Sequence, residues 1–153
     1  MILMRPTDEI KERLKRYIPL KIQTENHTER IARMKSQEQF PAARESDGSK
    51  HTPGASNDRM ANAILHRMEV EDRLADKIAA NVEEMNKIEA AISSLADTLE
   101  QEVLWMRYID VDEDGQRLKW EEITERMYHN IDRLSTVKRL HGRALESIRK
   151  VDI

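Results

Sequence analysis

The chain has 153 residues, of which 39% are hydrophobic and 36% charged, with no cysteine and a single phenylalanine. This composition excludes disulfides, thiol nucleophiles and cysteine-ligated zinc, and it suits long solvated helices better than a thick β core. The formal net charge of −3 is unevenly spread, since residues 117–153 carry +3 and the preceding residues −6, which favours a polyanionic partner.

The first predicted element is a helix over residues 1–40. Thr7 is placed to cap its start, and Asp8 and Glu9 follow where the helix dipole favours negative charge. Apolar residues keep roughly helical spacing to about residue 39. Because Pro19 lacks a backbone donor and clashes with the preceding turn, we expect a kink near it, at about Ile18.

Residues 41–57 are predicted to form a flexible linker. Pro41, Gly48, Pro53 and Gly54 lie there among small polar residues, without apolar periodicity. The stretch is long for a loop inside a compact domain, so we expect it to be mobile. It separates the helix before it from the helix after it.

Residues 58–94 are predicted to form one long amphipathic helix. Its stripe has the three-and-four spacing of a coiled-coil seam: Met60, Ile64, Glu71, Leu74, Ile78, Val82, Met85, Ile88 and Ile92. Glu71 is a polar member and argues against a tight zipper. The two long helices need a cover for their stripes, which a hairpin within one chain or a homodimer would provide. The sequence does not choose between them.

Residues 95–150 are predicted to form a compact unit of three helices. Asp97 followed by Glu100 is a capping-box pattern that opens the first of them. Its expected apolar residues are Leu99, Val103, Leu104, Met106 and Tyr108. An acidic turn at 110–118 follows. The second helix is expected from about residue 119 to 128, and its buried residues are Trp120, Ile123 and Met127.

The last predicted helix runs from about Asp132 to Lys150, after a turn in which Asn130 or Asp132 can act as the cap. One face is apolar and must pack inward: Leu134, Val137, Leu140, Ala144 and Ile148. His141 lies near that face, where we expect a packed, hydrogen-bonded histidine. The other face is polar and basic, and Gly142 within it leaves room for the close approach of DNA or of a neighbouring helix.

That basic face is the candidate DNA-binding surface. Arg and Lys pair with phosphates or bridge guanine O6 and N7, while Ser and Thr donate to phosphates or base edges. The residues assigned to it are Arg133, Ser135, Thr136, Lys138, Arg139 and Arg143. Arg139 and Ser135 are expected to read bases, and Lys138 and Arg143 to contact phosphates. A basic, solvated helix of a bundle without DNA binding is the competing interpretation.

Three short stretches carry a resemblance to known regulators. They are Trp105-Met106-Arg107-Tyr108, Trp120-Glu121-Glu122-Ile123 and His141-Gly142-Arg143-Ala144-Leu145. Residues 95–149 resemble region four of bacterial sigma factors, a helix-turn-helix that contacts promoter DNA. The whole layout is similar to small phage transcriptional regulators of the RinA and ArpU type. The resemblance implies a phage or prophage activator of late or packaging genes, with double-stranded DNA and RNA polymerase as partners.

The chain departs from that family in two loops. The turn at 128–132 is about three residues longer, which leaves the register of the last helix open by a residue or two. The loop from Asp110 to Lys119 is also longer, and Asp110, Asp112, Asp114, Gly115 and Glu121 fit an EF-hand pattern. A solvated acidic turn is preferred, because Arg117 and Leu118 stand where such loops carry an apolar residue and a ligand.

Other classes find less support in the sequence. The histidines at 27, 51, 66, 129 and 141 are scattered without zinc spacing, and no glycine-rich phosphate loop is present. No apolar run approaches the about 20 residues of a membrane span, and residues 1–4 are too short for a signal-peptide core. We expect a cytoplasmic, all-α DNA-binding regulator without enzymatic activity, cofactor or metal. The alternative is a helical module that docks to polymerase or another protein.

Overall fold

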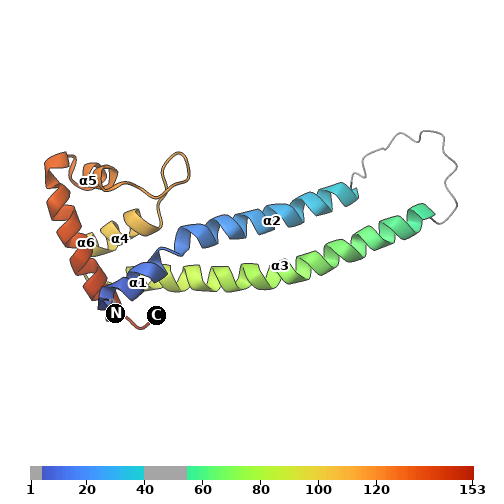
Figure 1. Cartoon of the computed structure of the whole chain (residues 1–153), viewed down its shortest axis with the longest axis horizontal. Helices are drawn as coiled ribbons and strands as arrows, with labels where there is room; N and C mark the ends of the chain where they lie inside the picture. The colour runs from blue at the N-terminus through green and yellow to red at the C-terminus, as the bar shows by residue number, and fades with distance from the viewer. Residues whose placement is uncertain (1–4, 40–54) are drawn as a thin grey trace. The chain divides into compact units, whose positions relative to one another are not determined.

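The computed structural model describes residues 5–39 and 55–153, and it confirms the all-α prediction (Figure 1). Within those residues the chain forms helices and one isolated bridge between Val111 and Arg117, with no strand. The elements, in chain order, are α1 Pro6–Leu14, α2 Tyr17–Gln39, α3 Ala55–Ser93, α4 Thr98–Tyr108, α5 Trp120–Tyr128, the 3-10 turn η1 Ile131–Arg133 and α6 Leu134–Arg149.

The break in the first helical segment falls earlier than predicted. Helix α1 ends at Leu14, residues 15 and 16 form a turn, and α2 begins at Tyr17. Pro19 therefore lies in the first turn of α2, where its missing N–H costs no intrahelical hydrogen bond. Most of the predicted linker at 41–57 lies outside the described residues, and residues 55–57 belong to α3.

The chain divides into two compact units, and one of them spans Ile22–Val82. In this unit α2 and α3 pair as an antiparallel hairpin. Arg67 Nε donates to Glu38 Oε1 at 2.8 Å, and Asn81 Nδ2 donates to Gln23 Oε1 at 2.9 Å, so the late part of α2 meets the early part of α3. A second chain is therefore not needed to cover the stripe that faces α2. Met60 and Val82, predicted as members of that stripe, are 51% and 39% exposed, which corrects their assignment.

Glu71, the polar member of the predicted seam, is placed between two cations. Its carboxylate lies 3.2 Å from Lys35 Nζ and 2.6 Å from Arg67 Nη1. The side-chain hydrogen bond from Lys35, with help from Arg67, lowers the pKa of Glu71 below its ordinary value. Leu74 is buried one turn further along α3. The acidic residue thus fastens the hairpin instead of disrupting it.

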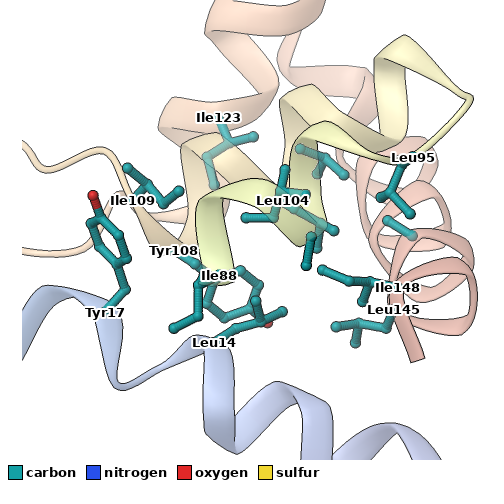
Figure 2. Packing of buried hydrophobic residues seen from close by; sticks show 14 of the residues in the cluster. Leu14, Tyr17, Ile88, Leu95, Leu104, Tyr108, Ile109, Ile123, Leu145 and Ile148 are labelled. Carbon is teal, nitrogen blue, oxygen red and sulfur yellow. The ribbon is translucent and has the colours of Figure 1, made fainter. Parts of the chain in front are cut away.

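The other unit comprises the described part of Met1–Lys21 together with Glu83–Ile153. Its core takes residues from α1, the start of α2, the end of α3 and all the later helices (Figure 2). Leu14, Ile88 and Ile92 are fully buried together with residues of the predicted 95–150 unit. The C-terminal unit consequently contains more of the chain than the predicted residues 95–150. Its core also includes residues of α1 and of the last turns of α3.

Local signals set the start of α4. The Asp97 carboxylate accepts from the backbone N–H of Leu99 at 2.8 Å and of Glu100 at 3.3 Å, so Asp97 is the N-cap. Val103, Leu104 and Tyr108 are buried as expected. Leu99 is 48% exposed, which corrects its assignment to the core, because it lies in the first turn ahead of the packed part of α4.

The turn between α5 and α6 contains an extra helical piece. His129 ends α5 in the left-handed conformation, with φ 53°, and the Asn130 side chain accepts from the N–H of Asp132 at 3.0 Å. That cap opens η1, and α6 follows from Leu134 instead of Asp132. Asn130 is therefore the capping residue of the two that the sequence offered.

Candidate nucleic-acid interface

Helix α6 has the two faces that its sequence predicts. Val137, Ala144 and Ile148 are fully buried, Leu140 is 2% exposed, and Leu134 is half-buried. These residues pack in the core against α4, α5 and α1. The close-up in Figure 2 shows Leu145 and Ile148 pointing into the same cluster as Leu14 and Ile88. Burial of the apolar face fixes which face of α6 points outward.

The outward face carries the candidate DNA-binding residues. Five of the six are exposed, namely Arg133, Ser135, Lys138, Arg139 and Arg143, and Thr136 is half-buried. All six lie on α6 or at its N-cap, so the structure brings them together on one element. Thr136 is the least accessible of the six.

The cations on this face have no partner among the described residues. Arg133, Lys138, Arg139 and Arg143 make no ion pair there, whereas Arg149 near the end of α6 lies 3.0 Å from Glu146. Four unpaired positive charges between Arg133 and Arg143, along about 15 Å of helix, are free to meet phosphates. The face is thus electrostatically uncompensated.

Gly142 lies open on this same surface. A Cβ added to it would meet no heavy atom within 4 Å, and the residue is exposed. No neighbouring helix of the described residues therefore approaches α6 at Gly142, and the backbone there is open to solvent.

His141, the neighbour of Gly142, lies on the inward side of α6 and packs in the core. Its Nε2 lies 2.7 Å from the Tyr108 hydroxyl, and its ring packs edge-on against Trp120 with centroids 4.7 Å apart. Burial lowers the pKa of His141 to about 4 and raises the pKa of Tyr108 to about 12, so both side chains are neutral near pH 7. This agrees with the expectation of a packed, hydrogen-bonded histidine.

The partners of His141 were not readable from spacing alone. Tyr108 and Trp120 come from α4 and α5, so one hydrogen bond and one ring contact link all three helices. The sequence could have suggested such a pair only through the general rule that a buried tyrosine or histidine needs a polar partner. With α6 pinned in this way, its rotation about its own axis is set by neutral core contacts.

Arg107 braces the same junction from outside. Its guanidinium lies 4.3 Å from the centroid of the Trp120 ring, and its Nη1 donates to the Leu118 carbonyl at 2.7 Å. Burial, and secondarily the charge of Arg117, lowers the pKa of Arg107. All three stretches that carry the family resemblance therefore contribute to this structural junction, through Arg107 and Tyr108, Trp120, and His141.

The acidic loop between α4 and α5 is a hairpin turn. One Asp112 carboxylate oxygen accepts from the backbone N–H of Asp114 at 2.9 Å and of Gln116 at 2.8 Å. Gly115, with φ 78°, supplies the left-handed residue of the turn. Among residues 5–39 and 55–153, no three His, Cys, Asp or Glu side chains are grouped to hold a metal ion. The EF-hand interpretation has no support in this geometry.

Helix α5 adds little positive charge to the surface beside α6. Its exposed charged residues are Glu121, Glu125 and Arg126. A polyanion approaching this unit would therefore be attracted by α6 and repelled by the first turn of α5. No helix in the described ranges is long and apolar enough to cross a membrane.

Comparisons with known proteins add no further constraint. No protein-family model, curated protein or solved structure matches the chain. The geometry of α6 and the residues on its exposed face are therefore the features that bear on function.

Proposed function

We propose that the chain is a DNA-binding transcriptional regulator that inserts α6 into the major groove of a duplex. The observation that carries the proposal is the set of four exposed, unpaired cations on α6 and at its N-cap, on a helix whose apolar face is packed in the core. A helix with one face held by the core and a free basic face has the form that helix-turn-helix proteins use to read DNA.

The roles of the side chains follow from their chemistry and position. Helix-turn-helix proteins contact base edges mainly through the N-terminal residues of the second helix. Ser135 lies in the first turn of α6, and Arg139 follows one turn later on the same face. An arginine there can bridge O6 and N7 of guanine, while Lys138 and Arg143, at the flanks, are suited to phosphates.

The biological setting rests on the family resemblance. The chain resembles regulators of the RinA and ArpU type in the layout of a charged first helix, a polar linker and a long central helix, followed by the stretches at 105–108, 120–123 and 141–145. The proposal is therefore a phage or prophage activator of late or packaging genes, acting on double-stranded DNA together with RNA polymerase.

A second candidate function is a helical protein-interaction module. The observation that favours it is the set of exposed apolar side chains on α3, with Leu65 58% and Met68 48% exposed. An amphipathic helix of this kind is a docking surface for another helix. The two candidates differ in which residues matter, since one uses α6 and the other uses α3.

The test starts from selection of bound sequences out of random duplex DNA by the full-length protein. Affinity for the selected duplex is then measured by fluorescence anisotropy at several salt concentrations. We expect the Arg139→Ala, Arg143→Ala double variant to lose most of the binding. Arg149→Ala is the matched control, because Arg149 is an exposed arginine of α6 already paired with Glu146. Equal binding by wild type and the double variant would reject the proposal.

A further inference from the structure

Ile131 is an exposed apolar residue beside the candidate DNA-binding surface. Its side chain is 50% exposed, and it is the one large hydrophobic side chain exposed in the described stretch from residue 120 to residue 149. The residues on either side of it, Asn130 and Asp132, are polar and exposed. Ile131 belongs to the turn at 128–132, which is longer here than in the regulators that the chain resembles, so the resemblance says nothing about its role.

Hydrogen bonds hold the backbone of this turn, so Ile131 is presented at a defined position. The Asn130 side chain accepts from the N–H of Asp132 at 3.0 Å, and the N–H of Arg133 donates to the Asn130 carbonyl at 3.1 Å. The N–H of Leu134 donates to the Ile131 carbonyl, so η1 runs directly into α6. Because a β-branched side chain has few rotamers, Ile131 also loses little conformational freedom on contact with a partner.

The position of Ile131 along the helix groups it with the residues assigned to DNA. Ser135 follows it by four residues and Lys138 by seven, which is the spacing of side chains on one side of a helix. All three side chains are exposed. Arg133 and Lys138 make no ion pair with a described residue. A duplex held by these two cations would therefore lie over Ile131 as well.

We propose that Ile131 is a specificity-determining residue that packs against the C5-methyl group of a thymine in the major groove. This inference rests on the proposed function of α6. An isoleucine gains nothing from a phosphate, and the adjacent Asp132 is repelled by one, so the turn suits the base edges better than the DNA backbone. The thymine methyl is the apolar group that the major groove presents on those edges. The chemistry of Ile131 therefore selects thymine at one position of the bound sequence.

The distance from Ile131 to Arg139 limits where that thymine lies. Arg139 is the residue to which the proposed function gives a guanine, and it follows Ile131 by eight residues. At about 1.5 to 2.0 Å per residue, the two side chains start about 13 Å apart along the helix. Successive base pairs are about 3.4 Å apart. The thymine is therefore expected within about four base pairs of the guanine that Arg139 reads.

The test combines changes in the protein with changes in the DNA, using the full-length chain and the duplex selected from random sequences. Each thymine of the selected site is replaced in turn by uracil, which lacks only the C5-methyl group. We expect one replacement to weaken binding by the wild type about fourfold, which is the effect of one buried methyl-sized group. The same replacement should leave the affinity of Ile131→Ala unchanged. Ile131→Val should keep the dependence on the methyl group, because valine retains a branched apolar side chain.

Leu99→Ala is the matched control, because Leu99 is a similarly exposed apolar residue, 48% exposed, that belongs to α4 instead of α6. It should respond to uracil as the wild type does. Circular dichroism checks that each variant keeps its helical content. If the wild type and Ile131→Ala respond alike to every uracil replacement, the role of Ile131 is overturned while the proposed function stands. A wild type that selects no duplex rejects the proposed function, and the role of Ile131 falls with it.

Discussion

The buried pair of His141 and Tyr108 makes the stability of the protein depend on pH. His141 is 7% exposed, and its Nε2 lies 2.7 Å from the tyrosine hydroxyl. Desolvation is the main reason that the pKa of His141 falls from 6.5 to about 4, and the charges of Lys11 and Arg107 act in the same direction. In the unfolded chain the imidazole is exposed and returns to its ordinary pKa.

The direction of the effect follows from proton uptake. Between pH 6.5 and about 4 the unfolded chain binds a proton at His141 that the folded protein does not bind, so the free energy of unfolding falls as the pH falls. The lowered pKa corresponds to a loss of about 3 kcal/mol across this window, at about 1.4 kcal/mol per pH unit. Below about pH 4 both states are protonated, and the contribution becomes constant.

The assay is urea denaturation followed by circular dichroism at several pH values from 7.5 to 4.5. We expect His141→Gln to be less stable than wild type at pH 7.5, because it perturbs the packing on Trp120, but to lose less stability on acidification. His66→Gln serves as the control, since His66 is exposed on α3. Carboxylates titrate equally in the wild type and both variants, so the difference in slope isolates His141. If wild type and His141→Gln lose stability in parallel between pH 6.5 and 4.5, the reasoning is wrong.

Three further predictions concern α6 and its support. Arg139→Ala is expected to cost about 1–3 kcal/mol of specific DNA affinity and to relax base preference at one position, measured by anisotropy on single-base variants of the selected duplex. Lys138→Ala should instead weaken all duplexes alike and reduce the slope of log affinity against log salt by about one; a position-specific loss would contradict its role at phosphate. Leu14→Ala, in the fully buried contact between α1 and the core, should lower the free energy of unfolding by about 2–5 kcal/mol in urea. An unchanged unfolding midpoint would mean that α1 does not belong to the C-terminal unit.

Several features of the fold were predictable because their causes are local. Asp97 caps α4 by accepting from the N–H groups of Leu99 and Glu100, so four consecutive residues contain that information. The apolar and basic faces of α6 are likewise written at helical spacing, so the burial of Val137 and Leu140 and the exposure of Arg139 match the prediction. The candidate site could be named residue by residue for this reason, although its function remains a proposal.

What the linear pattern left undecided depends on residues far apart in the chain. Periodicity identifies that α3 has apolar stripes, but only the paired helices decide that Leu74 is covered by α2 while Leu65 is left exposed. The same holds for Leu14, whose place in the C-terminal core follows from contacts across more than half of the chain. The sequence contains the helices and caps such as Asp97, because short-range hydrogen bonds and spacing specify them. Thr7, predicted to cap the first helix, is wrong in that role, since it lies inside α1 and Arg5 is the N-cap. Tertiary packing alone decides which helix faces are buried and which stay exposed. The reason is that a helix face is buried only where another helix packs against it.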